Sequence, residues 1–209
     1  LMGHETPTAL ADKIVDALKT DSNPDGLFLH PGSKQYQHLC FTGGEPLMAT
    51  GQLASMGIYK ALKKKNNLPK SMTFETNGTQ TLREPFKQWI KDIPEEIFFS
   101  VSPKLFTVSG EKTEKAIKPE NVAEYTECSN RGQLKFVVGA ADREWDELEM
   151  TVEKFRKAGV QWPVWIMPTG AREEEQVATA GQVAEKAFKK GYNVAARVHV
   201  YLFGNAIGT

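Results

Sequence analysis

The sequence predicts an α/β fold in which a parallel sheet is flanked by helices. Apolar strand-like runs alternate with segments of helical periodicity along almost the whole chain, and such alternation is typical of parallel strands joined by helical crossovers. The chain has 209 residues, of which 40% are hydrophobic and 25% charged, enough for one substantial core. Because no linker or strong internal repeat divides it, we expect a single domain over residues 1–209.

Helical periodicity predicts the crossover helices in order. Thr6 followed by Pro7 is a typical helix start, and apolar residues three and four apart then continue to Leu18. Further helices are expected at residues 53–64, 82–90, 122–128, 145–158 and 173–190. Pro85 is expected to interrupt the helix at 82–90 near its start, and a glycine ends each of the last two helices.

Short apolar runs between these helices predict the strands. They cover residues 38–41, 72–75, 97–101, 134–138 and 164–167, and a final extended segment is expected at 194–203. Turn residues at 23–26 and 31–32 separate the first helix from the first strand.

Charge and cysteine content exclude several classes of protein. Lys plus Arg and Asp plus Glu are 26 each, which argues against a nucleic-acid or membrane-surface partner. No apolar run is long enough to span a bilayer. The two cysteines, Cys40 and Cys128, are not in a paired motif, so a reducing, cytoplasmic location is expected. Cys40 lies between Leu39 and Phe41 and is predicted to be buried.

Four predicted strands end in polar turns that contain glycine or proline. These turns are Thr42-Gly43-Gly44-Glu45-Pro46, Glu75-Thr76-Asn77-Gly78-Thr79, Ser102-Pro103-Lys104 and Pro168-Thr169-Gly170. In parallel α/β folds, ligands bind beyond the carboxyl ends of the strands. Four such turns at the same edge of the predicted sheet predict a shared cleft, although each turn taken singly is at least as well explained as an ordinary turn.

The residue types in these turns suit a zwitterionic ligand with a ribose. The backbone carbonyls near Gly43 and Gly44 and the carboxylate of Glu45 could face an ammonium group, and Lys104 could face a carboxylate. Hydroxyl groups at Thr76 and Ser102 could bind sugar or carboxylate oxygens. This chemistry permits S-adenosylmethionine without singling it out.

The ordered motifs resemble those of radical S-adenosylmethionine enzymes, in particular the 7-carboxy-7-deazaguanine synthase family. The first two turns resemble two motifs of the superfamily, and the segment from Val101 to Lys104 is similar to one typical of the synthases. Residues 134–138 and the ending from His199 to Thr209 continue the resemblance, which runs in order from about Leu39. It implies an incomplete (βα)6-type partial barrel, whose first strand and cluster loop are absent from the sequence shown.

The resemblance also assigns site residues. The expected S-adenosylmethionine contacts are Gly43, Gly44, Glu45, Gly78, Ser102, Pro103, Lys104, Met167, Pro168, Thr169 and Gly170. Thr76, His199 and the terminal carboxylate of Thr209 are expected to contact a pterin substrate. No catalytic side chain is assigned. Among the histidines, only His199 matches a family position.

The family needs three cysteine thiolates for a 4Fe-4S cluster, and no such trio occurs in this sequence. The resemblance therefore implies cluster cysteines upstream of Leu1, together with a Mg²⁺ ion and a reducing donor such as flavodoxin or ferredoxin. A homodimer is compatible with it.

The implied activity is the conversion of 6-carboxy-5,6,7,8-tetrahydropterin to 7-carboxy-7-deazaguanine, by radical ring contraction and loss of ammonia, in queuosine-type biosynthesis. Two alternatives stay open. One is another radical S-adenosylmethionine enzyme, such as an activase that makes a glycyl radical. The other is a binding or regulatory protein on a barrel without a cluster.

Overall fold

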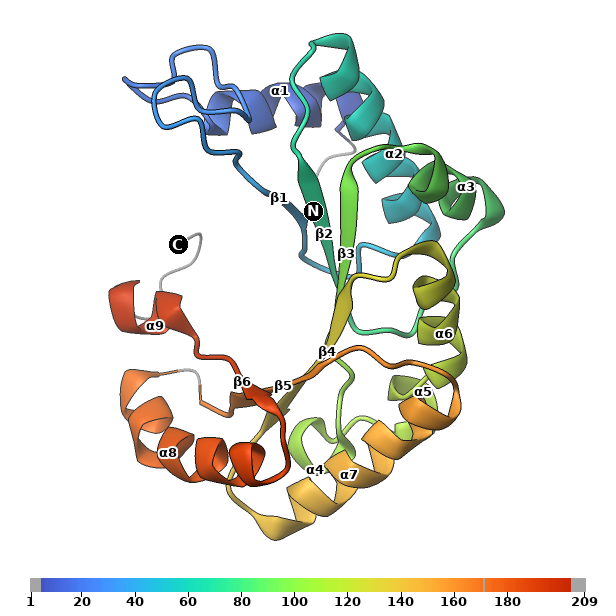
Figure 1. Cartoon of the computed structure of the whole chain (residues 1–209), viewed down its shortest axis with the longest axis vertical. Coiled ribbons are helices and arrows are strands. Elements are labelled where there is room, and N and C mark those ends of the chain that lie inside the picture. Colours follow the sequence, from blue (N-terminus) through green and yellow to red (C-terminus); the bar gives the residue numbers. More distant parts are fainter. Residues whose placement is uncertain (1–4, 171, 204–209) are drawn as a thin grey trace. The chain divides into compact units, whose positions relative to one another are not determined.

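The structure is a computed structural model that describes residues 5–170 and 172–203. The strands are β1 (Leu39–Phe41), β2 (Ser71–Thr76), β3 (Glu96–Val101), β4 (Gly132–Val138), β5 (Val164–Pro168) and β6 (Asn193–Val194). The helices are α1 (Pro7–Ala17), α2 (Ala49–Lys64), α3 (Glu84–Asp92), α4 (Phe106–Ser109), α5 (Thr113–Ala116), α6 (Pro119–Cys128), α7 (Asp142–Lys157), α8 (Glu173–Lys189) and α9 (Val198–Phe203). Figure 1 shows these elements along the chain.

The strands form one six-stranded sheet in the order β1-β2-β3-β4-β5-β6. The pairs β1–β2, β4–β5 and β5–β6 are parallel, with Leu39 opposite Met72 and Leu134 opposite Val164. Helices precede or follow each strand and flank the sheet (Figure 1). The predicted α/β class with a parallel sheet is therefore confirmed.

The described chain groups into two compact units. The first runs to Thr76 and resumes at Gln80–Phe99, and the second contains Asn77–Thr79 and continues from Ser100. The boundary falls within β3, so both units contribute strands to the sheet. The expectation of a single domain stays a prediction.

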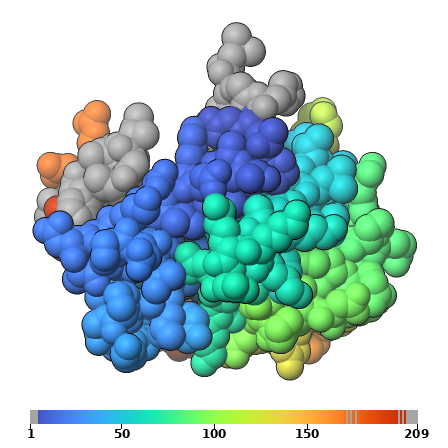
Figure 2. Space-filling model, turned by 90° about the horizontal axis from the view of Figure 1, so that it is seen from above, coloured from blue at the N-terminus to red at the C-terminus, as the bar shows by residue number. Residues whose placement is uncertain are grey.

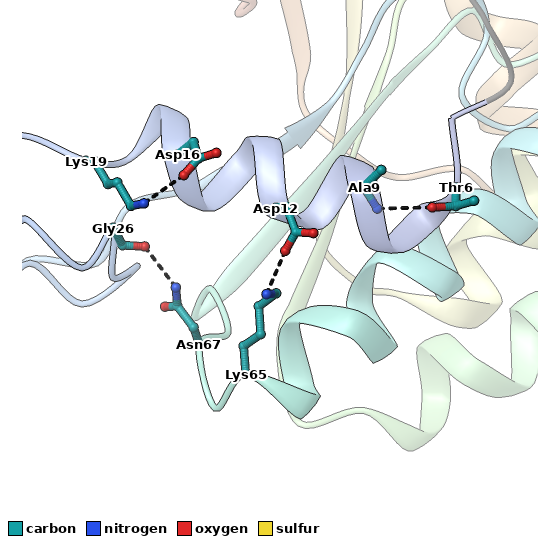
Figure 3. Close-up of polar contacts among 8 residues, drawn as sticks. All are labelled: Thr6, Ala9, Asp12, Asp16, Lys19, Gly26, Lys65 and Asn67. Carbon is teal, nitrogen blue, oxygen red and sulfur yellow. Dashed lines mark hydrogen bonds and ion pairs between the residues drawn. The ribbon is translucent and has the colours of Figure 1, made fainter.

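Helix α1 and the loop that follows it are tied to α2 within the first unit. Thr6 caps α1 as predicted, because its Oγ1 accepts a hydrogen bond from the Ala9 amide at 3.2 Å (Figure 3). Lys65 forms an ion pair with Asp12 at 2.6 Å. The buried Asn67 donates to the Gly26 carbonyl oxygen at 2.8 Å, which anchors the loop. Figure 2 shows this loop in mid-blue beside the dark blue of α1.

Aromatic packing builds the core of the first unit. Phe74 of β2 is fully buried, stacks on Phe41 with ring centroids 4.9 Å apart, and meets the edge of Phe86 of α3 at 5.4 Å. In the second unit, β4 alternates buried and half-buried residues along its length. Phe136 of β4 faces Phe155 of α7 at 6.4 Å. This alternation shows that α7 covers one face of β4.

The structure corrects the prediction for Cys40, which is exposed rather than buried. In β1 the side chain of Leu39 is buried and that of the next residue points to the opposite face of the strand. Apolar neighbours in the sequence therefore gave no information about burial, because alternate residues of a strand face opposite sides.

The extended segment expected at 194–203 is also wrong. Only Asn193 and Val194 pair with β5, and residues 198–203 form helix α9. Val200 is buried whereas Val198 and Leu202 are exposed, which is the spacing of a helix face. Valine, tyrosine and phenylalanine favour strands locally, but no further strand residues pair with β5 beyond Val194 in the described chain.

Two smaller differences concern the start of α3 and two short helices. Pro85 lies in the first turn of α3, where a missing amide costs nothing, and so does not interrupt the helix. Helices α4 and α5 have four residues each, too few for a periodic pattern to reveal them. Across the described residues, no helix combines the length and apolar character that crossing a bilayer requires.

Candidate active site

The first predicted turn follows β1 and leads into α2. Gly43 and Gly44 have φ angles of 81° and 55°, in the left-handed region that favours glycine. Both are exposed, and a Cβ atom at either position would meet nothing within 4 Å. Backbone conformation rather than crowding therefore accounts for the two glycines, and the turn leaves its peptide groups accessible to a ligand.

Glu45 is held in one orientation by its neighbours. Its Oε1 accepts a hydrogen bond from the Thr76 hydroxyl at 2.7 Å and another from the Leu47 amide at 3.0 Å. Thr76 is only 4% exposed, at the end of β2. A second bond joins the same two strand ends, from the Thr42 hydroxyl to Glu75 at 3.1 Å. The carboxylate beside the Gly-Gly turn is thus positioned before any ligand arrives.

Gly78 has a different role from Gly43 and Gly44. Its φ is 80°, and a Cβ there would lie 2.8 Å from Val101 and 3.0 Å from Val122. Asn77 closes this turn, since its Oδ1 accepts from both the amide and the hydroxyl of Thr79, at 2.9 and 2.7 Å. Gly78 is therefore needed for packing, because the turn lies too close to β3 and α6 for any side chain at this position.

The third turn follows β3, and its three residues differ in solvent exposure. Ser102 is half-buried, Pro103 is buried and Lys104 is exposed. Lys104 takes part in no ion pair among the residues that the structure describes. Its ammonium group is therefore available at the carboxyl end of β3.

Glu147 of α7 fixes the segment that follows Lys104. It accepts hydrogen bonds from the Phe106 and Thr107 amides, both at 2.8 Å, and from the Thr107 hydroxyl at 2.6 Å. Partial burial raises the pKa of this carboxyl, but the three hydrogen bonds outweigh burial and hold the pKa below its ordinary value. Nothing in the sequence singles out Glu147, since it lies in a helix rich in charged residues.

The fourth turn follows β5. Met167 is half-buried and Pro168 is buried, and the Thr169 amide continues the ladder by donating to the Val138 carbonyl at 3.0 Å. Thr169 Oγ1 lies 3.1 Å from the position that a Cβ on Gly139 would take. The ends of β4 and β5 therefore lie close together at this edge.

The remaining predicted site residues are less fully described. His199 lies in α9, and Thr209 lies outside the described residues. Within the first unit the structure brings Gly43, Gly44, Glu45 and Thr76 together. Gly78, Ser102–Lys104 and Met167–Gly170 belong to the second unit, and the shared cleft stays a prediction.

The described residues do not fit an iron–sulfur cluster. They contain no group of three or more His, Cys, Asp or Glu side chains placed to hold a metal ion. Cys40 belongs to the first unit and Cys128 to the second. Within the first unit, the Gly43-Gly44 turn and the fixed carboxylate of Glu45 together suit an ammonium group.

Two surface hollows lie away from the predicted turns. One, of about 230 Å³, is lined by Tyr36, Leu68, Pro69, Lys70, Pro94 and Glu95, near the amino ends of β2 and β3. The other, of about 250 Å³, lies between α7 and α8 and is lined by Asp142, Trp145, Asp146, Lys186, Lys189 and Lys190. Neither contains a predicted site residue.

Comparison with known proteins supports the family resemblance. No family model matches the chain. It is 27% identical over 183 residues to a 7-carboxy-7-deazaguanine synthase of Rhodopirellula baltica, and the match covers 83% of this chain. The chain spans 64% of the length of that relative. The crystal structure of SuiB from Streptococcus suis is similar with a TM-score of 0.48 at 11% identity, over 84% of this chain and 44% of that one.

Proposed function

We propose that the chain is part of a radical S-adenosylmethionine enzyme that converts 6-carboxy-5,6,7,8-tetrahydropterin to 7-carboxy-7-deazaguanine. The ordered motifs and the 27% identity to a synthase of that name support the proposal. The observation that carries it is the exposed Gly43-Gly44 turn with the fixed Glu45 carboxylate beside it. Such an arrangement suits the ammonium end of an amino acid.

In this proposal the protein orients S-adenosylmethionine, which supplies the radical chemistry when bound. Glu45 and the peptide groups of Gly43 and Gly44 face its amino group, and Lys104 faces its carboxylate. The Ser102 hydroxyl lies toward the ribose. Gly78, Pro103 and the segment Met167–Gly170 line the rest of the pocket. An iron–sulfur cluster and a magnesium ion remain expectations from the family resemblance. The flavodoxin- or ferredoxin-type donor, the homodimer and the cytoplasmic location are expectations as well.

Thr76 was expected to contact the pterin, and its surroundings suggest a second role. Its side chain is buried and its hydroxyl donates to Glu45. We therefore propose that Thr76 acts mainly by orienting Glu45. His199 and Thr209 remain the proposed pterin contacts from the family resemblance.

Calorimetry of S-adenosylmethionine binding tests the pocket. The complete gene product should be purified without air and its iron content measured. Glu45→Gln and Lys104→Ala should each weaken binding about 10- to 100-fold, as expected when one charged hydrogen bond is lost. Glu111→Gln and Lys112→Ala are matched controls at exposed positions and should leave affinity unchanged. Unchanged affinity in both pocket variants would refute the assigned site.

Two substitutions separate the roles of Thr76. Thr76→Ser keeps the hydroxyl that Glu45 accepts, whereas Thr76→Val removes it at nearly constant volume. If Thr76 positions Glu45, only the valine variant weakens S-adenosylmethionine binding, and its pterin affinity in the loaded enzyme stays close to that of the unaltered protein. If Thr76→Val instead weakens only pterin binding, Thr76 contacts the pterin directly.

Turnover decides between the proposed reaction and its alternatives. Consumption of the carboxypterin with formation of 7-carboxy-7-deazaguanine is the expected result. Cleavage of S-adenosylmethionine without pterin consumption would favour another radical enzyme. If the air-free protein binds neither iron nor S-adenosylmethionine, the binding-protein alternative prevails.

A further inference from the structure

The strands β1 and β2 have one face that is polar and open to solvent. Successive side chains of a strand point to opposite sides. On the first side Leu39, Met72 and Phe74 are buried, and Phe86 of α3 packs against Phe74. The opposite side, which we call the polar face, carries His38, Cys40, Thr42, Ser71, Thr73 and Glu75. Ser71 and Thr73 are half-buried and the other four are exposed.

Hydrogen bonds hold the polar face in one arrangement. His38 shares a hydrogen bond through Nδ1 with the Ser71 hydroxyl at 2.8 Å, and another through Nε2 with the Thr73 hydroxyl at 2.7 Å. Partial burial lowers the pKa of His38, so its ring is mostly neutral at pH 7, with one donor nitrogen and one acceptor nitrogen. One hydroxyl therefore donates to the ring and the other accepts from it, so the pair can offer a ligand both a donor and an acceptor.

The carboxyl end of the polar face adjoins the turn that is proposed to hold the ammonium group. The Thr42 hydroxyl donates to the Glu75 carboxylate at 3.1 Å. Thr42 directly precedes the Gly43-Gly44 turn, and Glu75 directly precedes Thr76, whose hydroxyl binds Glu45. All of these residues belong to the first unit. A ligand on the polar face would therefore lie beside the proposed binding site for the amino group of S-adenosylmethionine.

An open polar face is unusual for parallel strands. β1 and β2 pair in parallel, and parallel sheets normally have both faces covered, so that their strands are apolar on both sides. Strands that surround a ligand are an exception, because their inward side chains contact the ligand rather than a second layer of helices. The polar face thus has the composition of a surface that lines a binding site.

The side chains of the polar face restrict the chemistry of the ligand. They comprise hydroxyls, an imidazole, a thiol and the carboxylate of Glu75, and the six include no lysine or arginine. An anionic group would meet this carboxylate without a cation to balance it, which is unfavourable. N–H groups suit Glu75 as an acceptor, and C=O groups suit the hydroxyls as donors. We infer that the polar face binds an uncharged heterocyclic ring through its N–H and C=O groups.

This inference rests on the proposed function, in which the ring is that of the pterin substrate. The pterin ring carries amino, N–H and C=O groups, which match the acceptor and donor groups of the polar face. Glu75 accepts from the N–H groups, and the hydroxyls of Ser71 and Thr73 bind further along the ring edge. The pterin carboxylate is directed away from Glu75, because the two charges repel each other.

Cys40 reports whether the polar face is occupied. It is exposed on this face, whereas Cys128 is half-buried in α6 of the second unit. The complete gene product, kept free of air, should be treated with iodoacetamide, and alkylation of each cysteine followed by peptide mass spectrometry. At a carboxypterin concentration of about ten times its Kd the face is free about a tenth of the time, so alkylation of Cys40 should slow about 10-fold. Alkylation of Cys128 should not change, and S-adenosylmethionine alone should protect neither cysteine.

A substitution on the face gives a second test. Thr73→Val removes one hydroxyl at nearly constant volume and should weaken carboxypterin binding about 3- to 10-fold, measured by calorimetry on protein loaded with S-adenosylmethionine. Affinity for S-adenosylmethionine should stay unchanged. Thr126→Val is the matched control, because Thr126 is also half-buried and its hydroxyl donates to the Ala123 carbonyl within α6 at 2.7 Å. It should change neither affinity, and melting temperatures should confirm that both variants fold.

The outcomes separate this inference from the proposed function. If calorimetry shows that carboxypterin binds but alkylation of Cys40 does not slow, the inference is overturned and the proposed function stands. Protection of Cys40 by S-adenosylmethionine alone would assign the face to that ligand, and resistance to alkylation without any ligand would show that protein covers it; either result overturns the inference. If the unaltered protein binds no carboxypterin, the proposed function fails, and the inference fails with it.

Discussion

Replacing Glu147 with glutamine should loosen the chain directly after Lys104. The carboxylate accepts hydrogen bonds from the Phe106 and Thr107 amides and from the Thr107 hydroxyl. A glutamine side chain places an NH₂ group against at least one of these donors and removes the charge. Hydrogen bonds to charged groups contribute about 1.5–3 kcal/mol each, so we expect a loss of about 2–3 kcal/mol in the free energy of unfolding at pH 7.

The pH dependence of this loss gives an independent check. The folded-state pKa of Glu147 is lowered, so its contribution is fully present above its unfolded-state pKa and is lost as the pH falls through the lower folded-state value. The difference between the unaltered protein and Glu147→Gln should therefore stay constant above about pH 5.5 and shrink below about pH 4.3.

Urea unfolding and amide hydrogen exchange measure the effect. Exchange at Phe106 and Thr107 reports local opening even where the rest of the chain stays folded. Glu153→Gln is the control on the same helix, because Glu153 forms only an exposed ion pair with Lys157 at 2.7 Å, and it should cost about 0–1 kcal/mol. Equal stability of the two variants at pH 7, or a difference that grows with acidification, would refute the reasoning.

Two further substitutions test the turns that hold the chain together. Gly78→Ala should destabilise the protein more than Gly159→Ala, because both glycines have positive φ but, of the two, only Gly78 has no room for a Cβ, which would lie 2.8 Å from Val101. We expect each substitution to lower the free energy of unfolding by about 1–2 kcal/mol through backbone strain, and Gly78→Ala by about 1–3 kcal/mol more through the clash. Urea unfolding midpoints measure the difference. Asn67→Ala leaves the Gly26 carbonyl without its bond and should cost about 1–3 kcal/mol, visible as a lower thermal midpoint; an unchanged midpoint would show that water replaces the amide.

The sequence alone predicted the order of the longer helices and of strands β1 to β5, and the place of the polar turns. Periodicity located α2, α7 and α8, and apolar runs located β2 to β5, because these elements each bury one regular face. The positive φ angles at Gly43 and Gly44 also follow from local chemistry. The family resemblance rests on three of these turns together with residues 134–138 and the ending from His199 to Thr209, all of them short contiguous segments.

Tertiary structure decided which side chains meet. The bond between Thr76 and Glu45 joins residues 31 positions apart, and Glu147 reaches Thr107 from 40 positions away, so no local pattern could reveal either. The exposure of Cys40 and the helical state of residues 198–203 depend on which neighbours pack against them or pair with them. Local sequence sets backbone preference, whereas burial and pairing depend on partners that only the folded chain brings together.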